Sequence, residues 1–203
     1  MHHPSFPLFN KLNIILASAS PRRYQLLKES GINFNVVIPN VNENYPSFLK
    51  AESIALYVCK LKADSINIDD YPDNTVIITA DTIVWLNGEK ISKPKDRQDA
   101  SNILNKLSGN MHEVITGVLI KAKKRDITFA VKTKVYFKLM DKEEIDYYLD
   151  NYSPYDKAGA YGVQEWIGHT CISRIEGSFV NIMGLPVKQV FEALKKFAQD
   201  KSL

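Results

Sequence analysis

The chain has 203 residues, a mass of 23.1 kDa and a formal net charge of +3. A hydrophobic content of 45% with 24% charged residues is ordinary for a globular protein with a substantial core. The weak basic excess suits a small polyanionic ligand and is too small to indicate DNA, so we expect no nucleic-acid partner. The length fits one large domain or two small lobes.

Cysteine usage and hydropathy predict the compartment. Cys59 and Cys171 lie far apart in a chain that begins without a signal-peptide pattern, which indicates reduced thiols and a cytoplasmic protein. No apolar run is long enough to span a bilayer, so we expect no membrane partner. Residues 1–10 are polar and contain proline, and we expect a disordered leader that includes His2 and His3.

The hydrophobic pattern predicts alternating strands and helices along the first half of the chain. It predicts strands at 12–17, 34–38 and 75–86 and helices at 20–30, 47–66 and 96–107. Long β-rich runs at 111–121 and 128–140 then predict an antiparallel hairpin with a lysine-rich tip, followed by helices at 141–151 and 186–198. This mixture predicts an α/β or α+β fold with a sheet flanked by helices.

The segment LASASPRR, residues 16–23, connects the first predicted strand to the first helix. Ser20 and Pro21 suit the N-cap and the first helical position. Arg22 and Arg23 oppose the positive end of the helix dipole, so helix stability does not explain them. Free N–H groups and guanidinium groups at a helix start suit a phosphate, and two solvated arginines on a surface helix are an equal alternative for this motif alone.

Asp81 lies within a run, residues 76–85, that otherwise has the pattern of a buried strand. A carboxylate there is costly unless it is paired or binds a metal, and a structural aspartate held by backbone donors is the alternative. An expected turn at 87–88 returns the chain beside this strand and could bring Lys93 near Asp81. Lys93 alone would more often be a solvated surface lysine.

The segment DKAGAYGVQ, residues 156–164, is rich in small residues. Gly159 and Gly162 permit unusual dihedral angles or a close backbone approach. The amide of Gln164 can both donate to and accept from a base edge. For this segment alone, an ordinary glycine-rich loop is the favoured alternative.

The segment GSFVNIMGLP, residues 177–186, predicts a short strand that ends where the last helix begins. We expect Ser178 and Asn181 to be turn and cap residues there rather than catalytic residues.

Six motifs occur together in the order found in the Maf (septum formation) proteins: LASASPRR, ADTIV, the Lys-Pro of 92–94, HEVITGV, KAGAYGVQ and GSFVNIMGLP. The chain resembles this family over roughly residues 12–197. The resemblance implies a single Maf-like domain over 1–203, with an elongated mixed sheet in two lobes around a central cleft, similar to inosine triphosphate pyrophosphatases. It also implies hydrolysis of a nucleoside triphosphate to the monophosphate and pyrophosphate, with Mg²⁺ or Mn²⁺, by a homodimer.

The resemblance assigns Asp81, Lys93 and Glu43 to catalysis, with Asp81 and Glu43 linked to the metal. Whether Asp81 is the base or a metal ligand stays open. It assigns substrate binding to Ser18, Arg22, Arg23, Lys62, Thr82 and Gln164. Bland alternatives are a solvated turn glutamate at position 43, a solvated helical lysine at position 62 and a simple β-former at position 82.

The run Tyr161–Gln164 resembles the subfamily that acts on dTTP and UTP in nucleotide-pool cleansing. A sister subfamily that acts on 7-methyl-GTP tends to carry Glu in place of Gln. Two departures from the usual pattern stand out: Ser92 replaces a glycine before Lys93, and Glu165 follows Gln164 where glycine is usual, which adds a charge near the expected base pocket. A modified-nucleotide pyrophosphatase and a cell-division regulator that binds partners are the alternatives.

Overall fold

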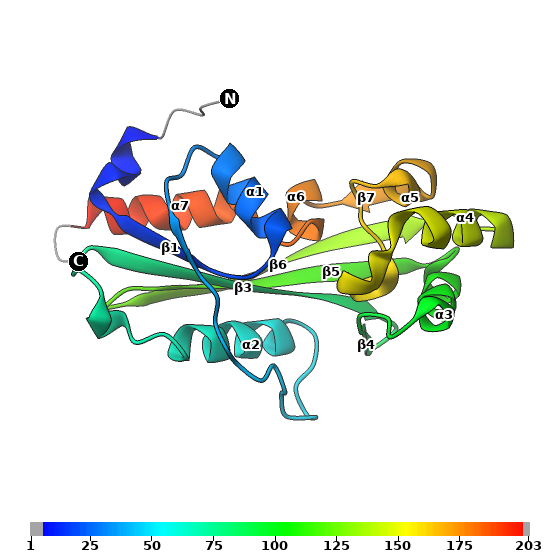
Figure 1. Ribbon diagram of the computed structural model, residues 1–203, viewed down its shortest axis with the longest axis horizontal. Coiled ribbons are helices and arrows are strands. Elements are labelled where there is room, and N and C mark those ends of the chain that lie inside the picture. The colour runs from blue at the N-terminus through cyan, green and yellow to red at the C-terminus, as the bar shows by residue number, and fades with distance from the viewer. Residues whose placement is uncertain (1–5, 201–203) are drawn as a thin grey trace. The chain divides into compact units, whose positions relative to one another are not determined.

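The computed structural model describes residues 6–200 (Figure 1). Its strands are β1 (Asn13–Ala17), β2 (Asn35–Val37), β3 (Thr75–Leu86), β4 (Glu89–Ile91), β5 (Met111–Lys121), β6 (Asp126–Phe137) and β7 (Ile172–Glu176). Its α-helices are α1 (Pro21–Glu29), α2 (Glu52–Asp64), α3 (Arg97–Leu107), α4 (Lys142–Tyr152), α5 (Trp166–Thr170), α6 (Phe179–Ile182) and α7 (Val187–Gln199). Short 3-10 helices are η1 (Pro7–Lys11), η2 (Ile68–Asp70), η3 (Pro154–Asp156) and η4 (Ala158–Ala160).

The strands form a mixed sheet in the order β2-β1-β3-β5-β6-β7, with β4 paired to β3. Strand β1 pairs in parallel with β2 and with β3, where Ile15 is opposite Ile77. Strands β4 and β7 pair antiparallel with β3 and β6 respectively. The predicted mixed α/β fold with a sheet flanked by helices is therefore confirmed.

The chain divides into two compact units. The first unit contains the chain up to Asp81, Thr116–Val131 and the chain from Gly184 onward, and the second contains Thr82–Ile115 and Lys132–Met183. The long strands β3, β5 and β6 each begin in one unit and end in the other. Asp81 and Thr82, neighbours within β3, are consequently assigned to different units.

In the first unit, helices α1 and α7 lie on one face of the strands and α2 lies on the opposite face (Figure 1). Strand β1 is buried from Ile14 to Ala17, as expected for a strand covered on both faces. Helix α7 buries Val190, Leu194 and Phe197 at helical spacing, so the predicted apolar stripe is confirmed as core packing.

Two predictions in the first unit are wrong. Residues 1–5 of the expected leader, with His2 and His3, lie outside the described residues, but the leader from Phe6 onward is folded. Phe9 is buried and packs edge-on against Phe191, which fixes η1 to the last helix. Helix α2 begins at Glu52 rather than at residue 47, because Ala51 has a positive φ of 48° that interrupts helical geometry.

In the second unit, helices α3 and α4 pack against each other and against the parts of β3, β5 and β6 that belong to this unit. The predicted capping box of α4 is present, since Asp141 and Glu144 each accept from the other's backbone N–H. The predicted turn at 87–88 is also confirmed: Asn87 and Gly88 both have positive φ, and Leu86 pairs with Glu89.

The expected strand within 177–186 is wrong. Ser178 caps a short helix by accepting from the N–H of Asn181, as its expected role as a cap residue requires. The buried Asn181 side chain donates to the carbonyl of Val114 and to Thr133 Oγ1. These tertiary contacts favour a helix over an extended β-branched run. Sequence patterning also missed α5 and β7.

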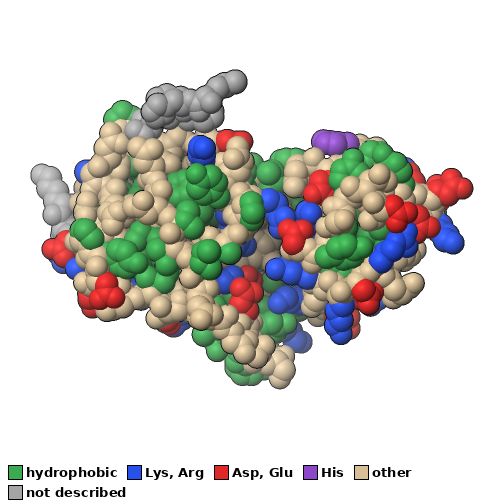
Figure 2. All heavy atoms as spheres, viewed as in Figure 1, with side chains coloured by type: hydrophobic (Ala, Val, Ile, Leu, Met, Phe, Trp, Pro, Cys, Tyr) green, Lys and Arg blue, Asp and Glu red, His purple; other side chains and the backbone are tan. Residues whose placement is uncertain are grey.

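The lysine-rich tip between β5 and β6 is confirmed as a polar turn, closed by a hydrogen bond from the Ala122 N–H to the Arg125 carbonyl. Lys123 pairs with Asp73 at 2.8 Å. On the face seen in Figure 2, acidic and basic side chains are interspersed rather than gathered by sign. None of the helices between residues 6 and 200 combines the length and the apolar character that a membrane crossing needs.

Candidate functional site

The loop between β1 and α1 has the local geometry predicted for it. The Ser20 side chain caps α1 by accepting from the Arg23 N–H. Ser18 is buried, and its Oγ accepts from the Ser20 N–H at 3.2 Å and from the Arg23 guanidinium at 3.4 Å. The two serines therefore hold the turn and the first helical turn in one fixed arrangement, with the N-terminal N–H groups of α1 at its start.

Arg23 connects this loop to the segment that precedes the last helix. Its Nε donates to the Gly184 carbonyl at 2.8 Å, which gives the Gly-Leu-Pro motif a structural role. Burial lowers the pKa of Arg23, while the charges of Asp81 and Glu43 oppose that shift. The guanidinium therefore lies in the electrostatic field of both carboxylates. Arg22, in the same helical turn, is partly buried.

Lys62, Asp81 and Glu43 form a charged group that we call the Lys62 cluster. Lys62 Nζ lies 2.9 Å from Asp81 Oδ1 and 2.9 Å from Glu43 Oε1. Lys62 and Asp81 are buried, whereas the Glu43 side chain is 55% exposed. One ammonium thus bridges two carboxylates, which explains how Asp81 is tolerated within a buried strand.

Close packing of α2 on the sheet places Lys62 beside Asp81. A Cβ on Gly117 of β5 would lie 2.8 Å from the carbonyl carbon of Ala55, so only glycine allows this approach. The buried Cys59 thiol donates to the Gly117 carbonyl at 3.1 Å, and burial raises its pKa to about 12. Thr79 of β3 donates to the Cys59 carbonyl at 3.0 Å. Cys59 therefore packs as a small apolar residue, as predicted.

The Lys62 cluster has oxygen donors of the kind that Mg²⁺ and Mn²⁺ prefer. Among residues 6–200, no group of three or more His, Cys, Asp or Glu side chains is arranged to hold a metal. Two carboxylates, however, suffice for a cation that takes its other ligands from water and substrate phosphates. Asp81 and Glu43 supply two such carboxylates within one group.

In the second unit, the glycine-rich loop is in contact with the segment that carries Lys93. Gly159 has a φ of 75° and donates its N–H to the Ser92 carbonyl at 3.4 Å. A Cβ on Gly159 would lie 3.0 Å from Val84 Cγ2, so the loop packs closely on β3 as well. Lys93 itself is exposed, beside the buried Pro94. Ser92 contacts the loop through its backbone carbonyl, and a glycine at this position would supply the same acceptor.

A buried polar pair that the sequence did not reveal joins this loop to β5. His112 Nε2 is 2.7 Å from the Tyr161 hydroxyl, and both side chains are buried against Phe137. Burial lowers the pKa of His112 to about 4, so the imidazole is neutral near pH 7. His112 and Tyr161 belong to two of the motifs, but nothing in their spacing along the chain indicates contact.

Glu165, the residue that departs from the usual pattern, turns back onto its own loop. Its carboxylate accepts from the Tyr148 hydroxyl and pairs with Lys157 Nζ at 3.1 Å. The Tyr148 hydroxyl in turn accepts from the Gly162 N–H at 3.0 Å. The Glu165 carboxylate, whose charge we expected near a base pocket, is therefore bonded to Tyr148 and Lys157.

The predicted site residues fall into two groups. Contacts or electrostatic interaction bring six of them together in the first unit: Ser18, Arg22, Arg23, Glu43, Lys62 and Asp81. Three others belong to the second unit: Thr82 and Gln164, which are partly buried, and Lys93. Their roles toward a substrate stay predictions.

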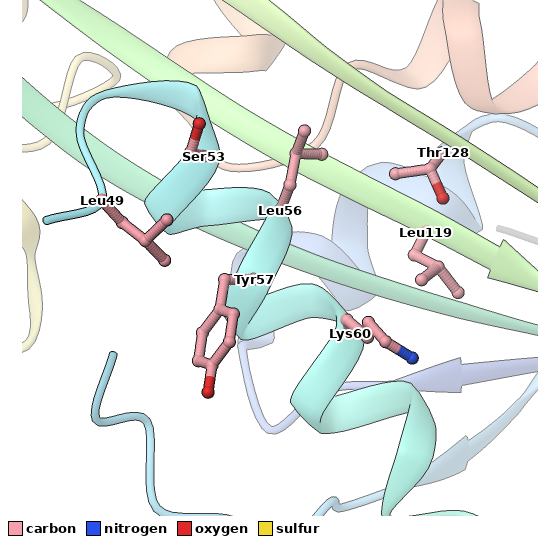
Figure 3. Close-up of a pocket in the computed structure, with 7 residues that line it drawn as sticks. All are labelled: Leu49, Ser53, Leu56, Tyr57, Lys60, Leu119 and Thr128. Atoms are coloured by element: carbon pink, nitrogen blue, oxygen red, sulfur yellow. The ribbon is translucent and has the colours of Figure 1, made fainter. Parts of the chain in front are cut away.

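The first unit also contains a cavity of about 350 Å³, shown in Figure 3. Its walls are largely apolar and come from the turn before α2, from α2 itself and from β5 and β6: Leu49, Ser53, Leu56, Tyr57, Lys60, Leu119 and Thr128. None of the predicted site residues lines it.

A helix start, a partly buried guanidinium and lysine-bridged carboxylates are groups that suit a phosphate-bearing substrate. The sequence profile described as Maf-like protein matches residues 13–197, and the chain belongs to the Maf family. It is 48% identical over 184 residues to the dTTP/UTP pyrophosphatase of Cytophaga hutchinsonii, covering 91% of this chain and 84% of that protein. It is 49% identical over 187 residues to the dTTP/UTP pyrophosphatase of Phocaeicola vulgatus, covering 92% and 96%. The enzyme of that name from Porphyromonas gingivalis is 44% identical over 191 residues, covering 93% and 96%.

Proposed function

We propose that this protein is a nucleoside triphosphate pyrophosphatase that hydrolyses dTTP and UTP to the nucleoside monophosphate and pyrophosphate. The observation that carries the proposal is the Lys62 cluster, a lysine-bridged carboxylate pair in a chain whose relatives are named dTTP/UTP pyrophosphatase. Phosphoanhydride hydrolysis requires charge neutralisation and an oriented water, and the cluster supplies groups for both.

In this proposal, the loop from Ser18 to Arg23 binds phosphate oxygens. The N–H groups at the start of α1 and the Ser18 hydroxyl are donors, and Arg22 and Arg23 add positive charge. Because Arg23 is held by Ser18 and by Gly184, little conformational entropy is lost when it binds an anion. Lys93 is proposed to bind the phosphates as well.

Asp81 is proposed to orient and deprotonate the attacking water. Lys62 binds Oδ1 of Asp81 and so holds the carboxylate in one orientation. The oxygen that accepts the proton of the water is therefore already positioned before substrate binds. Glu43 and Asp81 would hold a divalent cation, Mg²⁺ or Mn²⁺, which supplies neutralisation of the phosphate charge when it is bound. Lys62 is proposed to contact phosphate oxygens in addition to its two carboxylates.

Base recognition is assigned to Thr82 and Gln164. A uracil or thymine edge presents both a carbonyl and an N–H, and a neutral amide can pair with both. The turn in which Glu165 donates its N–H to the Gly162 carbonyl supports Gln164 in a fixed backbone conformation. The glycine-rich loop and Gln164 therefore form the proposed specificity element.

The test is product analysis. Purified protein with Mg²⁺ or Mn²⁺ is incubated with dTTP, UTP and 7-methyl-GTP, and products are separated by ion exchange. We expect monophosphate and pyrophosphate from dTTP and UTP, and no activity with a chelator present. Release of orthophosphate without pyrophosphate would exclude hydrolysis between the α- and β-phosphates. Preferential turnover of 7-methyl-GTP would exclude dTTP and UTP as the preferred substrates. Absence of turnover on all nucleotides would favour the partner-binding alternative.

The proposal also covers the compartment, the oligomeric state and the partners of the protein. We place the enzyme in the cytoplasm, where nucleotide pools are cleansed and where the buried thiols of Cys59 and Cys171 stay reduced. We also propose a homodimer, to be checked by light scattering on the purified chain. Binding to nucleic acid is not expected, and a gel-shift assay checks that expectation.

A further inference from the structure

We infer that Glu165 is a positioning residue, which acts through Tyr148 and Lys157 to hold the loop 156–164 in the conformation that presents Gln164. The inference rests on the proposed function, because it concerns the loop to which base recognition is assigned. We call the three side chains of Glu165, Tyr148 and Lys157 the loop clamp. None of them was among the residues predicted to bind substrate.

The clamp connects a helix to both ends of the loop. Tyr148 lies in α4 and is fully buried, and its hydroxyl donates to Glu165 and accepts from the Gly162 N–H at 3.0 Å. Lys157, at the beginning of the loop, pairs with the other oxygen of Glu165 at 3.1 Å. The Glu165 carboxylate thus joins the beginning of the loop to its end, with Tyr148 as the fixed point.

The small size of Gly162 allows this arrangement. A Cβ at position 162 would lie 2.5 Å from the carboxyl carbon of Glu165, so the carboxylate packs directly on the glycine backbone. Burial, reinforced by Glu165, raises the pKa of Tyr148, so the phenol stays protonated and remains a donor. The Glu165 and Lys157 side chains are only 18% and 11% exposed, which limits solvent screening of their ion pair.

The backbone of the loop needs such support. Gly159 and Ala160 are consecutive residues with positive φ, 75° and 57°, and Ala160 is not a glycine. A conformation that is unfavourable for alanine persists only when surrounding contacts determine it. The clamp supplies contacts on both sides of this pair, through Lys157 before it and through Gly162 and Glu165 after it. The hydrogen bond from the Gly159 N–H to the Ser92 carbonyl adds a contact at the pair itself.

The experiment compares wild type with Tyr148→Phe, Glu165→Ala and Glu165→Gln. Glu176→Gln is the matched control, since Glu176 is an ion-paired glutamate of the same unit, bound to Lys134. Two readouts are measured: amide hydrogen exchange of the peptide covering 157–165, and the separate KM and kcat values for UTP. Thermal unfolding verifies that each variant is folded.

We expect Tyr148→Phe and Glu165→Ala to accelerate exchange in that peptide and to raise the KM for UTP roughly tenfold, with kcat nearly unchanged. Glu165→Gln keeps an acceptor for Tyr148 and should fall between them and wild type, whereas Glu176→Gln should match wild type. Unchanged exchange would overturn the clamp. Faster exchange with an unchanged KM would overturn its role in positioning. If wild type does not hydrolyse UTP, the proposed function fails, while the exchange measurement still decides whether the clamp exists.

Discussion

The Lys62 cluster and the glycine-rich loop use charge in opposite ways. In the cluster, buried Lys62 and Asp81 meet Glu43, whose side chain is 55% exposed, so a group of three charges extends from the interior to the surface. In the loop, Lys157 pairs with Glu165 and with Asp156, and these charges hold the backbone. The cluster should therefore be sensitive to loss of charge at constant shape, and the loop to changes in hydrogen-bonding pattern.

The sharpest way to test the first half of this comparison is Asp81→Asn. The amide keeps the shape but removes the charge and the proton acceptor. We expect a folded protein whose kcat on UTP falls by roughly 10²–10⁴-fold, the usual loss when a general base is removed. Steady-state kinetics with thermal unfolding of the same sample measures both.

The matched control is Asp73→Asn, which changes another ion-paired aspartate of the first unit at a highly exposed position. It should retain wild-type activity. A folded Asp81→Asn protein with near-wild-type rate would make Asp81 a purely structural residue and would remove the basis of the proposed mechanism.

A second test removes the lysine instead of the carboxylate. Lys62→Met should lower the free energy of unfolding by roughly 3–5 kcal/mol, because it leaves the buried Asp81 without its ion-pair partner. Adding Asp81→Asn to this variant should restore most of that stability, since the uncompensated charge disappears. Urea unfolding of the two single variants and the double variant measures the coupling. Additive losses would show that the ion pair does not couple the two residues.

Local signals in the sequence predicted most of the fold. The Asp141 and Glu144 capping box, the turn at 87–88 and the β-branched run of β3 each depend on neighbours along the chain, and each appears where it was expected. The start of α2 and the helix α6 were mispredicted, because Ala51 has a positive φ and because Asn181 bonds to β5 and β6. The first depends on one backbone dihedral angle and the second on tertiary hydrogen bonds, and periodicity indicates neither.

The same distinction applies to the site. Asp81 was conspicuous because a carboxylate interrupts an apolar run, and a resemblance of motifs indicated Lys62 and Glu43. The clamp residue Tyr148 gave no such signal, since its position within α4 is that of an ordinary core residue. Lys157 and Glu165 are eight residues apart across a loop, and no periodicity predicts that they meet.

A third prediction concerns the buried His112, which contacts Tyr161 of the loop. The pKa of His112 is about 4 in the folded protein and 6.5 when exposed, so the unfolded state binds more protons between these values. The folded state should therefore lose stability as the pH falls from about 6.5 to 4, by roughly 3 kcal/mol in total, with no contribution above that window.

His112→Gln should remove this part of the pH dependence, and His169→Gln, at an exposed position, should not. The measurement is the free energy of unfolding in urea at several pH values between 4.5 and 7.5. Equal pH slopes in wild type and His112→Gln would show that His112 is protonated in the folded state as readily as in the unfolded state.

The smallest expected effect comes from Gln164→Glu, which tests the second half of the comparison. A neutral amide can donate to a carbonyl of uracil or thymine and accept from the ring N–H, whereas a carboxylate only accepts and faces that carbonyl with negative charge. An unmet polar partner costs roughly 1–3 kcal/mol, which is about one to two orders of magnitude in kcat/KM. The positively charged ring of 7-methyl-GTP and its N–H donors would instead favour the carboxylate. We therefore expect the ratio of kcat/KM for UTP to that for 7-methyl-GTP to fall by roughly ten- to a hundredfold. A ratio equal to that of wild type would transfer base recognition from Gln164 to Thr82 or to the backbone of the glycine-rich loop.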